Sequence, residues 1–407
     1  MLLGLVTQLR NEMDIAKTFI EHIDALFDRV YLVDHQSVDG TSELLKHVVS
    51  QRPGWKYYSL DVKTKVQRPV ANLLLHEAFS DGVDFLFFLD ADEFIEVSSR
   101  DDLERRLAGW VDHSTVGSLK WKNCVSHHFS DKEFTFHTPL WAPSEESEFE
   151  KVIIPKKLYD EYGKAITVTN GNHRVFLPRE KQIPSTPIGT LLHVPIRSFD
   201  QAVRKVILTV VAYRGYRKWG GENSFQYYDM LAKIARGRIS EVDLRGYTLS
   251  FDKQNRETPQ VTDDYLSNHG YQLTTFDQLN VATGGAIDFI APQRAMGFER
   301  IIANALDHLE SNIPDDVELT VKDGIIQIDE KALAARNLIE QNFINKRIMN
   351  LEFLLKAREQ KIDELNAEIS QNNEEIARYA ASMSWRMTRP LRIVLGYLRN
   401  KMHVHKP

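Results

Sequence analysis

The chain has 407 residues, of which 43% are hydrophobic and 27% charged, a balance typical of folded globular domains. Its formal net charge of −6 argues against a surface that binds nucleic-acid phosphates, so we expect no nucleic-acid partner. The one cysteine, Cys124, excludes an intrachain disulfide framework and a cysteine-rich zinc site. No apolar run reaches the roughly 18 residues of a membrane span, and the N-terminus lacks a basic signal-peptide region. We therefore expect a cytoplasmic protein.

The first hundred residues alternate between short apolar runs and segments with helical spacing. Strands are predicted at 2–7, 29–33, 56–60 and 85–89, with helices at 11–27, from 42 onwards and at 70–79. Buried strands separated by helices indicate parallel β-α-β units, and hence an open, mostly parallel α/β sheet flanked by helices. Ligands bind such sheets at the carboxyl ends of the strands. The polar residues that follow the strands are therefore the candidate site.

The middle of the chain has a mixed pattern. Strand-like segments at 117–125, 150–155, 165–169 and 189–195 precede a predicted helix at 199–214. Residues 225–312 are predicted to be mostly helical, with 246–270 left unassigned. The segment VELTVKDGIIQID predicts a β-hairpin, because an Asp-Gly pair stands between alternating residues.

The C-terminal part changes character at about residue 336. An apolar repeat with 4-3 spacing predicts a coiled coil of about five heptads, although one long helix packed on its own domain has the same spacing. The tail from residue 384 has no acidic residue and mixes Arg and Lys with apolar residues, which is typical of a segment on an anionic membrane. A disordered tail, or a helix that docks on a partner, is the alternative. The seam consists of Ile344, Ile348, Leu351, Leu355, Arg358, Ile362, Leu365, Ile369, Asn372, Ile376 and Tyr379.

Acidic residues stand directly after two of the predicted strands. In LDADEF, residues 89–94, an extended backbone would point Asp90 and Asp92 the same way, so that both carboxylates bind one cation. Mn²⁺ or Mg²⁺ fits such a site, because these ions prefer oxygen ligands and are completed by phosphate. A solvated strand end explains the same residues taken alone. In VDHQSVDGT, Asp34 can accept hydrogen bonds from a base or ribose, and Asp39, in the turn to the next helix, is a further candidate for substrate binding. An ordinary strand-to-helix turn explains the same segment.

Several motifs in this order resemble one enzyme family. LRNE at 9–12, VDHQSVDGT at 33–41 and FLFFLDADEF at 85–94 are similar to the nucleotide-sugar domain of family-two-type glycosyltransferases with the GT-A fold, in the branch whose metal motif reads DADEF. The similarity continues through KVIIPKKL, GNHRV and LLHVPIRSFDQAVRKV to about residue 205. The tail resembles segments that end bacterial surface-polysaccharide glycosyltransferases.

The resemblance implies a metal-dependent transferase. A sugar would pass from a nucleoside diphosphate, with a UDP-sugar as the expected donor, to a polysaccharide or lipid-linked glycan acceptor. We expect four parts: a GT-A-like domain at 1–215, a mostly helical accessory region with the hairpin at 216–335, the coiled coil at 336–380 and a basic amphipathic tail at 381–407. The coiled coil would make a homo-oligomer, and the tail would attach it to the inner face of the cell membrane.

The resemblance also implies roles for individual residues. Thr7, Leu9 and Arg10 would edge the base pocket, Asp34 would contact uracil or ribose, and Gln67 and Arg68 would contact the nucleotide. Asp90 would contact the ribose or a metal-bound water, and Asp92 and His193 would bind the metal. Glu93, in place of the commoner Asp, would orient the donor sugar or form a salt bridge. His173 and Lys205 are further candidates for binding the substrate. The alternative for His173 is a structural histidine, and the alternative for Lys205 is a basic helix face.

The general base is the least determined role. An inverting enzyme needs a carboxylate that deprotonates the acceptor hydroxyl. The family's Glu-Asp motif is absent, so the candidates for this base are Glu145, Glu146, Glu148 and Glu150. A reaction that retains the configuration also stays open. Trp141 either stacks on an acceptor sugar or lies in the core. Two other functions stay open: a catalytically degenerate scaffold in a membrane-associated assembly, and a sugar nucleotidyltransferase.

Overall fold

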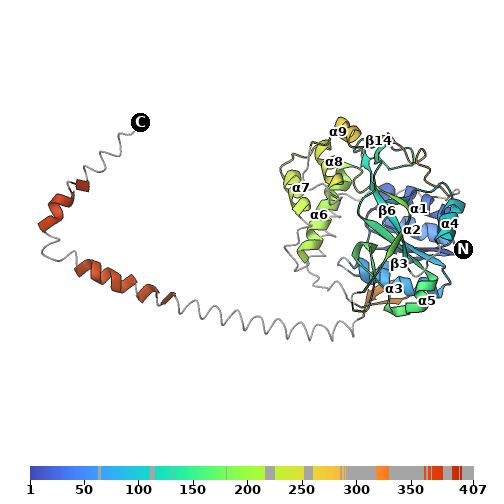
Figure 1. The fold of residues 1–407 in the computed structure, drawn as a ribbon, viewed down its shortest axis with the longest axis horizontal. Helices are drawn as coiled ribbons and strands as arrows, with labels where there is room; N and C mark the ends of the chain where they lie inside the picture. Colours follow the sequence, from blue (N-terminus) through green and yellow to red (C-terminus); the bar gives the residue numbers. More distant parts are fainter. Residues whose placement is uncertain are drawn as a thin grey trace. The chain divides into compact units, whose positions relative to one another are not determined.

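The computed structural model describes residues 1–62, 66–110, 115–130, 132–179, 181–215, 225–251, 260–284, 287, 289 and 318–329, and parts of 362–396. The chain divides into two compact units, Met1–Leu333 and Ala334–Pro407. The first unit is a mixed α/β structure around one large sheet (Figure 1). Across the described strands, the order in this sheet is β15-β16-β3-β2-β1-β4-β9-β6-β13-β5.

The sheet has a parallel centre. Strands β16, β3, β2, β1 and β4 pair in parallel, as do β6 and β13, whereas β9 is antiparallel to β4 and β6. This mostly parallel sheet agrees with the sequence analysis. Its strands are β1 (Leu3–Leu9), β2 (Arg29–Asp34), β3 (Trp55–Leu60), β4 (Phe85–Phe88), β5 (Glu93–Ile95), β6 (Val116–Asn123), β9 (Glu150–Pro155), β13 (Ser185–His193), β15 (Leu319–Lys322) and β16 (Ile325–Ile328).

Helices cover both faces of the sheet and make three layers. One core cluster joins α1 (Met13–Leu26), α2 (Thr41–Ser50) and α4 (Arg100–Gly109) to one face. The other joins α3 (Gln67–Ser80) and α5 (Lys156–Tyr162) to the opposite face. Alternation along β1 explains the division, because Leu5 packs in the first cluster and Val6 in the second.

A third group of helices packs beside the sheet. Helices α6 (Phe199–Gly215), α7 (Phe225–Ala235) and α8 (Glu241–Leu249) share one hydrophobic cluster, with α9 (Asp263–Asn268) in a neighbouring one. Two short 3₁₀ helices are η1 (Gly163–Ala165) and η2 (Asn170–Asn172). Two small sheets, in the orders β10-β11-β12 and β14-β8-β7, complete the unit. Their strands are β7 (Val125–Ser126), β8 (Leu140–Pro143), β10 (Thr167–Val168), β11 (Val175–Leu177), β12 (Lys181–Ile183) and β14 (Tyr271–Thr274).

The predicted hairpin is confirmed and extends the main sheet. Asp323 and Gly324 both have positive φ, as a two-residue hairpin turn requires. Strand β16 then pairs with β3 in parallel. The prediction of a mostly helical stretch needs a correction at β14, which is antiparallel to β8. Gly270, with a φ of +78°, turns the chain after α9 so that residues 271–274 pair with β8 and form an edge of the small sheet.

In the second unit, residues 369–378 and 387–393 are helical. The seam residues Ile362, Leu365, Ile369 and Ile376 are exposed. Ile344, Ile348, Leu351, Leu355, Arg358 and Tyr379 lie outside the described residues. Among the helices that are described, none combines the length and the apolar character that crossing a membrane needs.

Candidate functional site

The DADE segment forms a turn at the end of β4. The Glu93 N–H donates to the Asp90 carbonyl oxygen at 3.1 Å, so the backbone is bent where the sequence analysis assumed an extended chain. As a result, the two aspartate side chains have different partners. Asp90 bonds Lys151, and Asp92 bonds Lys205.

Asp92 lies among cationic and imidazole groups. Its Oδ2 accepts a hydrogen bond from Lys205 Nζ at 2.8 Å, and it lies 3.9 Å from both His193 Nε2 and Arg197 Nη1. The positive charges of Lys205 and Arg197 hold the pKa of Asp92 far below its usual value, although its burial acts in the opposite direction. Asp92 is therefore an ionised carboxylate at the edge of the sheet.

Asp92 and His193 fit a divalent cation that phosphate oxygens and water complete. His193 Nδ1 donates to Asn123 Oδ1 at 2.7 Å, so Nε2 carries the free lone pair, 3.9 Å from the Asp92 oxygen. Metal-binding histidines have this second hydrogen bond, and Mg²⁺ or Mn²⁺ needs only one or two protein carboxylates. Burial lowers the pKa of His193 to about 3, so the ring is neutral. No cluster of three or more His, Cys, Asp or Glu side chains that could hold a metal occurs among the described residues.

Asp90 belongs to a second charge cluster with Lys151 and Glu93. Lys151 Nζ lies 2.7 Å from Asp90 Oδ2 and 3.3 Å from Glu93 Oε1, and the lysine side chain is 1% exposed. Glu93 is fully buried, and this burial raises its pKa well above the usual value. Glu93 thus forms the salt bridge that the sequence analysis gave as one alternative.

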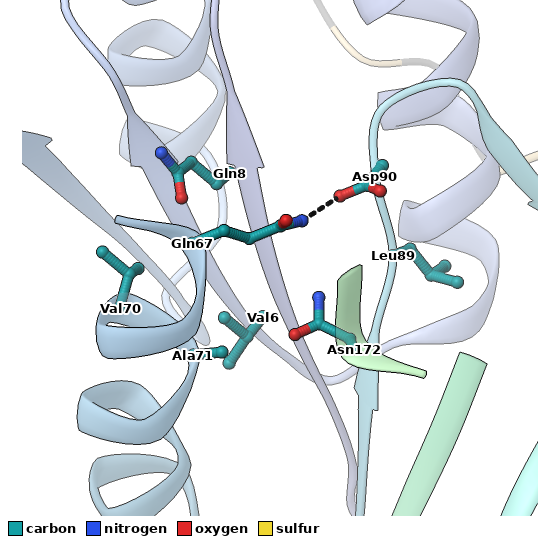
Figure 2. Close-up of a pocket in the computed structure, with 8 residues that line it drawn as sticks. All are labelled: Val6, Gln8, Gln67, Val70, Ala71, Leu89, Asp90 and Asn172. Atoms are coloured by element: carbon teal, nitrogen blue, oxygen red, sulfur yellow. Dashed lines mark hydrogen bonds between the residues drawn. The ribbon is translucent and has the colours of Figure 1, made fainter. Parts of the chain in front are cut away.

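Asp90 also borders a pocket between β1, α3 and η2. Figure 2 shows the Gln67 side chain reaching from the start of α3 to Asp90, where its Nε2 donates to Oδ1 at 2.9 Å. The pocket is a small hollow with an apolar wall that includes Val6 and Ala71, and the space between its lining residues, open solvent included, is about 220 Å³. Gln8 Oε1 and Asn172 Oδ1 are buried without a hydrogen-bond partner. The pocket can therefore accept hydrogen bonds from a ligand.

The residues near Asp34 have different surroundings. Asp34 is buried, which raises its pKa, and it accepts a hydrogen bond from the Ser37 N–H at 3.3 Å. Burial lowers the pKa of Arg10 to about 10, and the nearby Asp34 partly opposes this effect. Asp39 ties two helix starts together, because its oxygens accept from the Met13 and Thr41 N–H groups. Asp39 therefore has a structural role.

Two β1 candidates lie inside the protein. Leu9 is buried in the cluster under α1, on the opposite side of the sheet from α3, so a place in the base pocket does not fit it. Thr7 is also buried, and its Oγ1 has no hydrogen-bond partner. Arg68 lies exposed on the first turn of α3.

The expected acceptor segment has three exposed acids and one paired acid. Glu145, Glu146 and Glu148 are exposed. Glu150 pairs with Lys120 and Ser185, and these contacts lower its pKa although burial opposes them. Trp141 is only 7% exposed and packs in a core cluster with Leu266, so stacking on a sugar does not fit it. The buried ring favours the core position that was the alternative for Trp141.

His173 and Trp121 connect the two charge clusters. His173 Nδ1 donates to the Glu150 carbonyl at 2.7 Å, and burial lowers the pKa of this histidine to about 4. Trp121 stacks on His193 at a centroid distance of 4.2 Å and meets His173 edge-on at 5.3 Å. His173 therefore packs against the Trp121 ring that stacks on His193.

The sequence analysis missed Lys151, Gln8, Asn172 and Asn123. A lysine at the start of the apolar run KVIIP is the one signal that could have identified Lys151, because a buried lysine needs acidic partners. The other three are amides whose position depends on strand pairing. No local sequence pattern distinguishes them.

No protein-family model and no curated protein matches this sequence. Among solved structures, TarS from S. aureus aligns with 65% of this chain and 46% of that chain, at 13% identity and a TM-score of 0.30. The alignment thus spans less than half of that protein. TarS 1-349 aligns with 81% of this chain and 96% of that chain, at 12% identity and a TM-score of 0.31. The mannosyltransferase PcManGT from Pyrobaculum calidifontis was solved with GDP-Man and Mn²⁺. It aligns with 76% of this chain and 87% of that chain, at 12% identity and a TM-score of 0.31.

Proposed function

We propose that the chain is a glycosyltransferase that uses a nucleoside-diphosphate sugar. The observation that supports this best is the group of Asp92, His193 and Lys205 at the carboxyl edge of the sheet. An ionised carboxylate and a neutral imidazole suit a divalent cation, and the lysine suits phosphate oxygens. Beside this group, Asp90 and Gln67 offer hydrogen-bonding side chains for a ribose or base. Open α/β sheets bind nucleotides at this edge.

In this proposal, Asp92 and His193 hold Mn²⁺ or Mg²⁺, which supplies positive charge for the diphosphate of the donor. Asp34 and Asp90 accept hydrogen bonds from the nucleoside, and the expected donor is a UDP-sugar. Lys205 donates to a phosphate oxygen. These groups bind and orient the donor, so that its anomeric carbon faces the acceptor side of the sheet edge.

The chemical step in the proposal is an inverting displacement. The acceptor hydroxyl oxygen bonds the anomeric carbon while the bond from this carbon to the diphosphate oxygen breaks. A carboxylate takes the hydroxyl proton, and Glu145, Glu146 and Glu148 are better candidates than Glu150, whose lowered pKa makes it a weaker base. The leaving group is a nucleoside diphosphate, whereas a sugar nucleotidyltransferase would release pyrophosphate.

The proposed acceptor is a polysaccharide or lipid-linked glycan. We further propose a homo-oligomer through the segment 336–380 and attachment of the basic tail to the inner face of the cell membrane. The exposed apolar side chains at 362, 365, 369 and 376 support the first idea, because such a row needs a partner surface. We also propose that the chain divides into the four parts 1–215, 216–335, 336–380 and 381–407.

A scan of nucleotide sugars tests the function. Each donor is incubated with Mn²⁺, and its hydrolysis and the thermal stabilisation of the protein are measured. We expect one donor, a UDP-sugar, to be cleaved to UDP and to raise the melting temperature. Asp92→Asn should abolish the cleavage and the rise in melting temperature that the donor causes. If no donor is cleaved or stabilises the protein, the proposal is wrong and the scaffold function is favoured.

A further inference from the structure

We propose that Lys205 is an exchangeable counter-cation, which holds Asp92 in the free protein and moves to the donor diphosphate when a divalent cation takes its place. This inference rests on the proposed function. It goes beyond that function because it predicts that the metal and the nucleotide bind cooperatively, and that one lysine causes the coupling.

Three groups face the same Asp92 oxygen, but only one bonds it. Lys205 Nζ lies 2.8 Å from Oδ2, whereas His193 Nε2 and Arg197 Nη1 each lie 3.9 Å away. The Asp92 side chain is 8% exposed. A buried carboxylate needs a compensating charge, and Lys205 supplies it by direct contact.

Arg197 cannot move to a ligand without breaking a buried network. Its guanidinium bonds Glu12 and Asp14, and Nη1 donates to the Val194 carbonyl at 3.1 Å. The arginine side chain is 2% exposed. Arg197 thus fastens the segment after β13 to the start of α1, and it stays in place when a ligand binds.

Lys205 has the freedom that Arg197 lacks. Apart from Asp92, its Nζ contacts the Pro195 carbonyl at 3.0 Å and lies 5.4 Å from the centre of the Phe251 ring. The side chain is 24% exposed and ends a flexible four-carbon stem on α6. A rotation of this stem can carry the ammonium away from Asp92 without moving the helix.

The exchange follows from electrostatics. A divalent cation bound to Asp92 Oδ2 and an ammonium on the same oxygen repel each other, so the cation alone must displace Lys205 at a cost. The diphosphate removes this cost, because its oxygens provide a new partner for the displaced ammonium. The metal and the nucleotide therefore strengthen each other's binding, as linkage requires.

The test measures the affinity for each of the two ligands separately in the variant Lys205→Met. Binding of Mn²⁺ without nucleotide is measured by electron paramagnetic resonance, and binding of UDP at saturating Mn²⁺ by calorimetry. We expect Mn²⁺ alone to bind about two- to fivefold more tightly, the usual worth of a partly exposed ion pair. UDP should bind about tenfold more weakly, because a charge-assisted hydrogen bond is lost. The two affinities thus change in opposite directions.

Two further variants make the result decisive. Lys205→Gln should behave like Lys205→Met, and it serves as the replacement if the methionine variant does not fold. Lys156→Met removes an ordinary surface ion pair with Asp160, of 2.6 Å, and should leave both affinities unchanged. Mn²⁺ binding that is unchanged or weaker in the Lys205 variants, or UDP binding that is unaffected, overturns the proposal. If the wild type binds Mn²⁺ but none of UDP, GDP and ADP, the proposed function fails, and the Mn²⁺ measurement still decides whether Lys205 competes for Asp92.

Discussion

The cluster of Asp90, Glu93 and Lys151 places two acids around one buried lysine. Removal of one partner from such a cluster leaves an uncompensated charge. Glu93 relieves part of that charge by taking up a proton, since burial already raises its pKa. The cluster therefore stabilises the turn after β4, and with it the positions of both aspartates.

Lys151→Met should reduce the free energy of unfolding by about 3 kcal/mol, because it breaks a buried ion pair. The double variant Lys151→Met with Glu93→Gln should recover about 1 kcal/mol, since the neutral amide needs no proton to avoid an uncompensated charge. Urea denaturation measures both effects. The control is Lys120→Met on β6, which breaks a partly exposed pair with Glu150 and should cost no more than about 1 kcal/mol. Equal costs for Lys151 and Lys120 would contradict this account.

His22 is a buried histidine outside the candidate site. Its Nδ1 donates to the Ala282 carbonyl, and its Nε2 accepts from the Ile95 N–H, each at 2.9 Å. Burial lowers its pKa from 6.5 to about 4. The unfolded chain therefore binds more protons than the folded chain between these two values, so stability is lost as the pH falls through this window.

His22→Gln tests this linkage, because an amide can donate and accept at the same two places without titrating. Between pH 6.5 and 4, we expect the wild type to lose about 1 kcal/mol of stability per pH unit through this histidine. The variant should show a slope that is shallower by that amount. Urea midpoints from pH 7 to pH 4.5 measure it, and identical slopes would rule out a neutral His22 in the folded state.

At the level of secondary structure, the parallel centre of the sheet was predictable because its signals are local. The apolar runs FLFFL and RVYLV, and the helical spacing between them, depend only on neighbouring residues. The site was predictable only as a list of residue types. The turn at Asp90 breaks the alternation expected for D-x-D, and the Lys151 contact joins residues 61 positions apart. Strand β14 was missed for the same reason, since its partner β8 lies about 130 residues earlier.

The hairpin β15–β16 depends on the left-handed backbone of its turn. Gly324 has a φ of +75°, and its carbonyl accepts from the Ser59 N–H at 3.0 Å, which fixes the hairpin to β3. A Cβ at this position would lie 3.6 Å from the Tyr57 oxygen, an ordinary contact. Only the backbone conformation therefore opposes a side chain here.

Gly324→Ala should accordingly lower stability by about 1 kcal/mol. The matched control is Gly109→Ala at the end of α4, where φ is not left-handed and a Cβ meets no atom within 4 Å. The control should be neutral or stabilise by up to about 1 kcal/mol. Thermal unfolding of both variants measures the difference. A cost at Gly324 no larger than at Gly109 would show that the turn adopts another conformation.

On the scale of the whole molecule, the two compact units suggest a division between chemistry and placement. All the candidate site residues lie in Met1–Leu333, whereas the exposed apolar row lies in Ala334–Pro407. In the described part of the tail, Met387, Leu391, Ile393 and Leu395 are also exposed. Apolar side chains beside basic ones suit an anionic lipid surface.

Truncation after residue 335 tests this division. The shortened protein should be a monomer in light scattering, because it lacks the 4-3 seam that we propose joins the copies. It should still bind UDP with Mn²⁺ as the full chain does, since Asp34, Asp90, Asp92 and His193 are all retained. It should no longer sediment with vesicles that contain anionic lipid, whereas the full chain should, because several tails on one oligomer bind a surface together where one tail is marginal. Vesicles of neutral lipid are the control for the role of charge. A truncated protein that remains oligomeric would place the self-association in the first unit, and one that still binds the anionic vesicles would move the membrane contact there as well.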